Sequence, residues 1–222
     1  MPSRLRPESI RGRQSEARRN DLAVLDAARD VFAARGADAP ISDVAARAGV
    51  GMGTLYRRYG SKTELLQRLC VLAMEQSLAA AVVALANDDA WEGLTSYIRA
   101  GVDLRSGALA ALAGHVETTA EMRRTARRGL DLVADLVARA HADGSLRPDV
   151  TALDISRLIE QFSRRAPDPI DPAEEANVRD RLLAIALDGL RGPAHTGRPA
   201  GALPGKAPSR RAYVARWSTP DR

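Results

Sequence analysis

The sequence predicts an all-α protein. Only 4% of its residues are aromatic, whereas alanine, leucine and arginine, which favour helices, are abundant. Apolar residues recur at helical spacing through most of the chain, between breaks rich in Gly, Pro or Asn-Asp. With 222 residues, 45% of them hydrophobic and 27% charged, the composition is that of a globular protein able to bury a substantial core.

Several classes of protein are disfavoured. No apolar run approaches the roughly 18 residues needed to cross a membrane, and no apolar stretch follows the basic N-terminus as it would in a signal peptide. Cys70 is the single cysteine, which excludes an internal disulfide and a cysteine-built metal cluster. We therefore expect a cytoplasmic protein with no membrane partner and no cofactor.

The net charge of +5 is unevenly distributed. Residues 1–20 carry +4, residues 69–191 carry −5 and residues 192–222 carry +5. Cationic ends favour contact with a polyanion, although tails that only aid solubility have the same composition. We expect a basic flexible arm at 1–16. Five Pro and four Gly within 192–222 predict a disordered basic tail there.

The next segment predicts three helices and the start of a fourth. The first begins at Asn20, a good N-cap, and ends at Gly36. Two short helices follow, one from Pro40 to about Ala48 and one ending at Tyr59, and they are joined by a tight turn. This arrangement matches a helix-turn-helix motif at about 40–59. A capping box, Ser61 with Glu64, then opens a long helix that reaches about Ala86.

The remaining chain predicts a second helical domain. An Asn-Asp-Asp break at 87–89 precedes a helix around Trp91, residues 106–114 are ambiguous, and 115–142 form one or two helices. Thr151 and Asp154 resemble another capping box. Two amphipathic helices, at 151–165 and 173–191, flank a proline-rich loop and can form half of a four-helix bundle, so we expect a homodimer through them. The apolar face of the last helix carries Val178, Leu182, Ile185, Ala186 and Leu190.

The second helix of the motif has two different faces on a wheel of about 100° per residue. Leu55, Tyr59 and Met52 fall on the side expected to be buried. A bare Gly on the other side lets the backbone approach a groove wall, a Thr can contact a base edge or a thymine methyl, and an Arg pairs with guanine. These outward residues are Gly53, Thr54 and Arg57. Tyr56 and Lys62 are placed to reach phosphates.

These residues resemble the TetR family of transcriptional regulators. The resemblance covers about residues 17–77 and rests on VAARAGV at 44–50, GTLYRRY at 53–59, and Ser61-Lys62 with Leu65-Leu66. The helix order beyond it is also similar, including the DGSLRP loop at 143–148. The resemblance implies a helix-turn-helix DNA-binding domain at 17–77 and a helical domain at 78–191 that dimerises and binds a small ligand. It also implies a near-palindromic double-stranded DNA operator.

Carried over position by position, the resemblance implies DNA contacts by seven residues. Contacts to bases or backbone are implied for Gly53, Thr54 and Arg57. Contacts to phosphates are implied for Tyr56, Arg58 and Lys62, with Ser42 as a further candidate. Pro40 stands where the family commonly has Thr, so a phosphate contact from that position is in doubt.

We therefore expect a non-enzymatic, sequence-specific regulator, a repressor released from its operator by a small, largely hydrophobic ligand. An effector-independent architectural DNA-binding protein is the alternative. His115, Glu117 and Glu121 are spaced to line one side of a helix as metal ligands, but a pocket-lining or surface histidine is favoured, and no metal site or catalytic arrangement is expected. The candidate ligand-lining residues are Trp91, Tyr97, His115, Met122 and Phe162.

Overall fold

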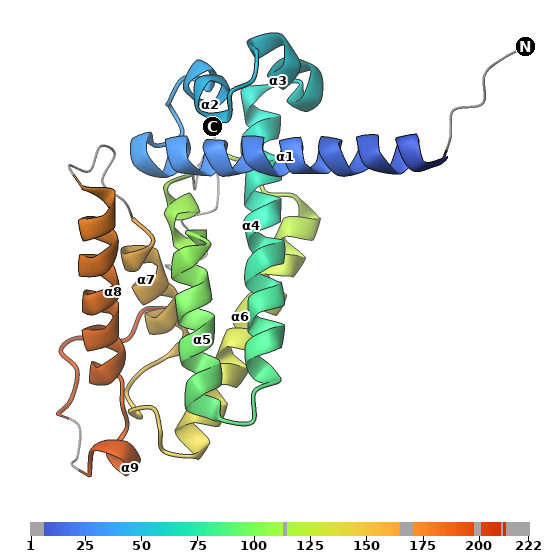
Figure 1. Cartoon of the computed structure of the whole chain (residues 1–222). Helices are drawn as coiled ribbons and strands as arrows, with labels where there is room; N and C mark the ends of the chain where they lie inside the picture. The colour runs from blue at the N-terminus through green and yellow to red at the C-terminus, as the bar shows by residue number, and fades with distance from the viewer. Residues whose placement is uncertain (1–6, 113–114, 165–170, 198–200, 210, 212–222) are drawn as a thin grey trace, which may run out of the picture.

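The computed structural model describes residues 7–112, 115–164, 171–197, 201–209 and 211. The chain is helical through most of these residues, which also contain one isolated antiparallel bridge between Leu146 and Arg191. Figure 1 shows α1 lying across one end of the molecule, with α2 and α3 on its outer side and the other long helices running away from it. The all-α prediction is confirmed.

The first part of the fold consists of α1 (Pro7–Arg35), α2 (Ile41–Ala48) and α3 (Met52–Tyr59). Their apolar faces share one core with the first turns of α4 (Lys62–Leu85). Because α4 continues straight into the second part, any tilt of its far end reaches this core. The fully buried side chains here include Leu25, Phe32, Val44, Leu55, Leu65 and Leu69.

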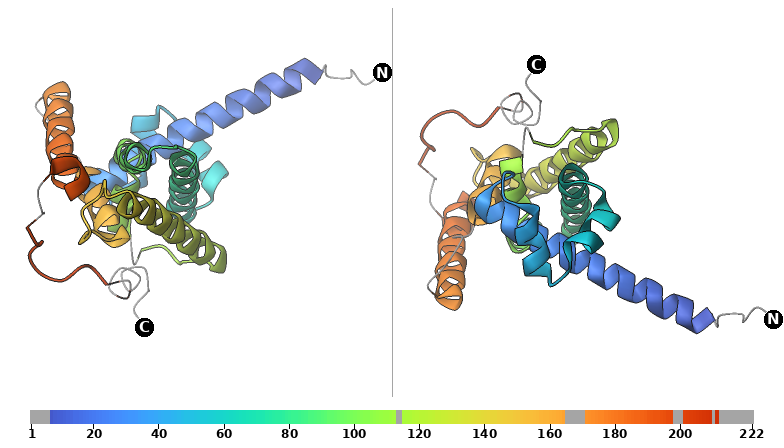
Figure 2. Two further views of the ribbon diagram at one scale, coloured as in Figure 1. Left: turned by 90° about the horizontal axis from the view of Figure 1, so that it is seen from below. Right: turned by 90° about the horizontal axis from the view of Figure 1, so that it is seen from above.

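Helix α1 begins earlier than the sequence predicts. It starts at Pro7 rather than at Asn20, so residues 7–16 of the expected flexible arm are helical. The residues before Asn20 are mostly good helix formers, and a proline is well suited to the first turn of a helix. They continue the helix through Asn20, which therefore caps nothing. Figure 2 shows this N-terminal half of α1 projecting well away from the rest of the molecule.

The second part packs α5 (Ala90–Asp103), the 3₁₀ helix η1 (Ser106–Leu112), α6 (Ala120–Ala142) and α7 (Ala152–Phe162) around α4. Each α-helix begins at a side-chain cap: Asp89, Thr119 and Thr151 accept hydrogen bonds from backbone amides three residues on. The predicted box of Thr151 and Asp154 has both of its bonds. The stretch 106–114, whose structure the sequence left open, contains the 3₁₀ helix η1. The segment 115–142 contains a single helix, which starts only at Ala120.

The two parts interlock. Leu109 and Leu112 of η1, Val116, and Met122 of α6 belong to the core beneath α1, not to the second core around Leu94 and Ile155. A boundary at residue 77 therefore divides the sequence but does not separate two independent cores.

Helix α4 is long and apolar enough to cross a membrane by length and composition alone. The expectation that no segment approaches this limit was wrong, because α4 contains an apolar window with few charged residues. In the fold, α4 is the central helix of the bundle, packed against α1, α5 and α6.

Helix α8 (Pro172–Gly189) is the least embedded of the long helices in the described part of the chain, and it lies at one side of the molecule (Figures 1 and 2). It buries Leu183 and Leu187, whereas Val178, Leu182 and Ile185 of its predicted apolar face are at least half exposed. In a single chain this stripe is therefore turned toward solvent.

The start of the expected disordered tail is docked. Gly192 donates its backbone N–H to the Ser145 carbonyl at 2.7 Å, and Leu203 donates to the Asp149 carboxylate at 2.9 Å. The Arg191 guanidinium lies 4.3 Å from the centre of the Trp91 ring. A short helix, α9 (Pro193–Thr196), follows Gly192. Residues 212–222, the end of the predicted tail, lie outside the described residues.

Candidate DNA-binding surface and interior cavity

The turn between α2 and α3 depends on Gly49. This residue has φ 66° and ψ 29°, the left-handed conformation, and its N–H bonds the Ala45 and Ala46 carbonyls. An added Cβ would meet no atom within 4 Å, so backbone conformation rather than space favours glycine. Val44, Ala45 and Leu55 are buried beside the turn and fix the angle of the two helices.

The outer face of α3 is largely as predicted. Leu55 and Tyr59 are buried, and Gly53, Thr54, Tyr56 and Arg57 are exposed. Met52, expected on the buried side, is instead 37% exposed, because it is the first helical residue and lies beyond the edge of the small core.

The fold itself does not require a glycine at position 53. A Cβ built there would meet no protein atom within 4 Å, and the residue has no positive φ. The absent side chain therefore leaves free space outside the protein surface, where a partner would approach.

Arg57 differs from its neighbouring arginines in having no acidic partner among the residues that the structure describes. Arg35 pairs with Asp43 at 2.6 Å, Arg58 pairs with Asp21 at 2.7 Å, and Arg47 pairs with Asp30. Arg29 lies 3.6 Å from Asp26. Among the described residues of 21–61, Arg57 is the one arginine with no ion pair, and it is exposed on the outward face of α3.

Asp21 anchors α3 to α1, which sequence reasoning missed. Its carboxylate accepts from Arg58 Nε and from the Tyr59 hydroxyl. Burial, followed by this hydrogen bond, raises the pKa of Tyr59 well above its ordinary value, so the phenol remains a donor at neutral pH. Arg58 is thus held against α1, whereas the family resemblance implies that it contacts a phosphate.

Lys62 and Ser42 lie at the starts of their helices. Lys62 opens α4, is half-buried, and places its Nζ 5.8 Å from the Phe32 ring centroid. Ser61 caps α4 by accepting from the Glu64 amide at 3.1 Å. Ser42 is exposed in the first turn of α2, whose N-cap, Pro40, supplies no side-chain bond.

A cavity of about 640 Å³ lies in the second part, between α4, η1 and α6, with walls from α5 and α7. Its lining is mostly apolar, and the hydroxyls of Ser77 and Tyr97 lie 3.2 Å apart within it. Cys70 also lines it, and burial raises the pKa of the thiol to about 12, so it stays protonated.

Two of the five predicted lining residues, Tyr97 and Met122, line this cavity, and the other three do not. Trp91 is buried beneath Arg191, His115 is exposed before α6, and Phe162 packs near the end of α7. Helical spacing alone does not distinguish a cavity wall from ordinary core. In the described part of the chain, no three His, Cys, Asp or Glu side chains gather as a metal site would require.

Asp30 of α1 connects the helix-turn-helix motif with the chain beside the cavity. It accepts from Arg47 of α2 and from Arg105, which follows the C-terminal end of α5. Arg105 directly precedes Ser106 and Gly107, which line the cavity, and has φ 49°. Nearby, the buried Arg29 donates to Gln76 of α4 at 2.8 Å.

Two protein-family models match the chain. Residues 24–69 match the bacterial regulatory proteins of the tetR family, and residues 72–192, more than half of the chain, match the C-terminal domain of SbtR-like transcriptional regulators. No curated protein matches.

Solved structures with a similar fold include three actinobacterial regulators. A TetR transcription regulatory protein of Mycobacterium vanbaalenii is 28% identical, with a TM-score of 0.54 over 80% of this chain and 98% of that one. A TetR regulator of Streptomyces coelicolor is 25% identical, with a TM-score of 0.53 over 78% and 98%. The ketosteroid transcriptional regulator KstR2 of Mycobacterium tuberculosis, 21% identical with a TM-score of 0.54 over 78% and 95%, shares the fold.

Proposed function

Because this chain belongs to the TetR family of bacterial regulatory proteins, we propose that it is a cytoplasmic repressor that reads its operator with α3 and leaves it when a small, largely hydrophobic molecule fills the cavity. Regulators of this family are DNA-binding proteins rather than enzymes. The reading residues and the ligand control are the parts proposed here.

The proposal that α3 reads the DNA sequence rests on Arg57, which is exposed and has no ion pair among the described residues of 21–61. A surface arginine without a carboxylate partner keeps its guanidinium available for a bidentate pair with guanine. Beside it, Gly53 leaves room for the groove wall, and Thr54 offers a hydroxyl and a methyl group. The neighbouring arginines are already paired with acids in the protein.

Phosphate contacts would then position α3 without specifying sequence. We assign these contacts to Tyr56, which is 44% exposed, to Lys62 at the start of α4, and to Ser42 at the start of α2. Arg58 reaches a phosphate only by sharing its guanidinium with Asp21.

Dimerisation would use α7 and α8, within the predicted segments 151–165 and 173–191. The exposed stripe of Val178, Leu182 and Ile185 supports this proposal, because contiguous apolar surface on a helix marks an interaction site. A two-fold dimer places two α3 helices on half-sites one DNA turn apart, about 34–36 Å, and so reads a near-palindrome.

The cavity favours ligand control over the effector-independent alternative. Its volume of about 640 Å³ lies within the range of small-molecule sites, about 300–1,000 Å³. Its walls include α4, which begins beside α3, and η1, which adjoins Arg105. A ligand that prefers one α4 tilt would change the spacing of the two recognition helices, and its differential affinity would weaken DNA binding.

The DNA-reading proposal is tested with Arg57→Ala. After selection of bound sequences from random DNA, the substitution is expected to cost about 1–3 kcal/mol on the selected operator and to relax preference at one position of each half-site. Fluorescence anisotropy with operator and single-base variants measures both effects. Arg124→Ala removes an exposed arginine of α6, far from α3, and is expected to change neither.

A second variant separates positioning from reading. Lys62→Ala is expected to weaken operator and random DNA by similar factors and to reduce the slope of log affinity against log salt by about 1. If Arg57→Ala behaved in this uniform way too, or left affinity unchanged, the proposed orientation of α3 in the groove would be wrong.

A further inference from the structure

The charged residues that line the cavity are of one sign. Arg123 and Arg127, both of α6, lie on its wall, and no Asp, Glu or Lys among the described residues joins them there. They are four residues apart in α6 and therefore lie on the same face of the helix, one turn apart. Both are exposed as well as lining, so the cavity reaches solvent beside them.

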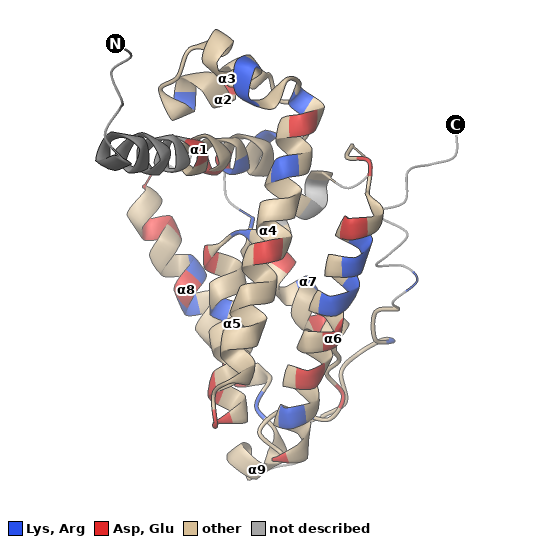
Figure 3. Ribbon diagram, turned by 90° about the vertical axis from the view of Figure 1, so that its right-hand side faces the viewer, with Lys and Arg blue, Asp and Glu red and all other residues tan. Residues whose placement is uncertain are grey.

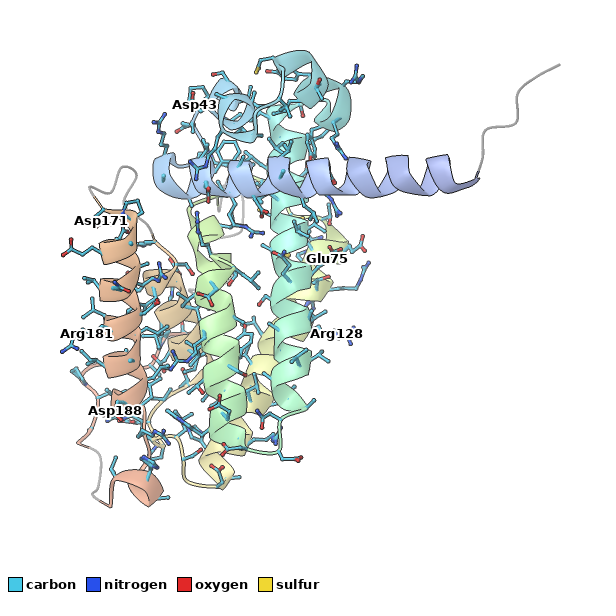
Figure 4. The ribbon with its side chains drawn as sticks, in the orientation of Figure 1. Asp43, Glu75, Arg128, Asp171, Arg181 and Asp188 are labelled. Atoms are coloured by element: carbon cyan, nitrogen blue, oxygen red, sulfur yellow. The ribbon has the colours of Figure 1, made fainter. Side chains whose placement is uncertain are left out.

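Neither arginine is neutralised by an acidic side chain in the described part of the protein. Arg123 donates from Nη1 to the Thr118 carbonyl at 2.6 Å, which leaves its charge uncompensated, and Arg127 has no ion pair there. Arg124 and Arg128 add two more cations to the same turns, and Figure 3 shows this half of α6 as a band of basic residues. Figure 4 shows Arg128 extending outward from this region.

The opposite walls are mostly apolar, although the Ser77 and Tyr97 hydroxyls also lie on them. Met74 and Leu78 of α4, Leu109 of η1 and Ile159 of α7 line them. A site with cations at the opening and apolar side chains within is complementary to a molecule that has an anionic head and an apolar body. A wholly neutral ligand would leave the two guanidinium groups without a partner of opposite charge.

We propose that the effector is an amphipathic anion whose carboxylate or phosphate binds Arg123 and Arg127 while its apolar chain fills the space between α4, η1 and α6. This inference rests on the proposed function only in taking this cavity as the effector site. Guanidinium groups suit both head groups, because their forked donors match two oxygens at once.

The position of Arg123 also connects a bound anion to α4. Thr118, whose carbonyl Arg123 holds, follows Glu117, whose carbonyl accepts from Gln67 of α4 at 3.4 Å. An anion that draws Arg123 away from Thr118 would alter this contact close to the DNA-binding end of α4.

The test compares dodecanoate, dodecyl phosphate and dodecanol, all below their micelle concentrations, by calorimetric titration of the full chain. At least one anion is expected to bind tenfold or more tightly than dodecanol, which corresponds to about 1.4 kcal/mol. Arg123→Gln with Arg127→Gln is expected to abolish this difference. The matched pair Arg124→Gln with Arg128→Gln removes the same charge from the same turns outside the lining, and is expected to keep the difference.

The two anions also show which head group the site prefers. Dodecanol binding as tightly as both anions would overturn the inference and leave the effector cavity itself standing. Equal loss in both double variants would also overturn it, because general surface charge rather than the lining pair would be responsible. Release of operator DNA is measured separately: binding with the expected preference but without release would count against ligand control, not against the anionic head. Failure of all three probes to bind would overturn the inference but not the proposed ligand control, which does not depend on a dodecyl chain.

Discussion

Replacing Leu182 with glutamate is expected to convert the proposed dimer into a folded monomer and to weaken operator binding about 100-fold or more. Leu182 is 50% exposed in the single chain, and Val178 and Ile185 flank it one turn away on each side at 50% and 59%. A two-fold interface contains the substituted residue twice, so two carboxylates would be buried among apolar side chains. Losing the dimer also removes the avidity of two linked half-site contacts, worth about 10²–10⁴ in affinity.

The measurements are sedimentation equilibrium, thermal unfolding followed by circular dichroism, and operator binding. Thermal stability of the monomeric unit should change little, because Leu182 contributes little to the core of its own chain. Val83→Glu is the matched control: Val83 is 72% exposed on α4, a helix that lies apart from α8 (Figure 1), and its substitution should leave the dimer intact. If Leu182→Glu remained dimeric at micromolar concentration, α8 would not form the interface.

The local features of this fold follow closely from the sequence. The capping residues Ser61 and Thr151 are identifiable because each is followed three residues later by an acidic residue, just before an apolar run at helical spacing. The outward face of α3 follows from helical periodicity, which separates Leu55 and Tyr59 from Arg57 whatever the rest of the chain does. The prediction that Met52 is buried was wrong, because periodicity gives the direction in which a side chain points but not how far the core extends at a helix end.

Features that depend on distant residues do not follow from the sequence in this way. Asp30 meets Arg47 and Arg105, which are 17 and 75 residues away, and no local pattern distinguishes it from an ordinary surface acid. The same holds for the cavity, whose walls come from five elements. The apolar stripe of α8 is visible in the sequence, but only the structure shows that its own chain leaves it uncovered.

Asp30→Asn is expected to uncouple the cavity from the DNA-binding surface. Asp30 links Arg47 of the helix-turn-helix motif to Arg105, and its side chain is 22% exposed. Gly107, two residues after Arg105, packs so closely on α7 that an added Cβ would lie 2.3 Å from the Glu160 Cα. Because η1 is held this tightly, a ligand that shifts it relative to α1 must change the Arg105–Asp30 contact. Removing the charge of Asp30 weakens both ion pairs at once.

Couplings of this kind are typically about 1–3 kcal/mol, or 5- to 150-fold in affinity, and we expect Asp30→Asn to bring the factor close to one. Operator affinity is measured with and without the tightest-binding probe of the calorimetric series. The converse measurement, probe affinity with and without operator, must give the same factor because the linkage is reciprocal.

Asp43→Asn is the control, since it breaks the 2.6 Å pair with Arg35 in the same DNA-binding unit, and Asp43 does not line the cavity. If Asp30→Asn kept the coupling factor of the unsubstituted protein, the effect of the ligand on DNA binding would instead pass through α4 alone, by way of Gln76 and the first turns beside α3. Loss in both variants would indicate general loosening of the DNA-binding unit, whereas loss in Asp30→Asn alone places the connection at this carboxylate.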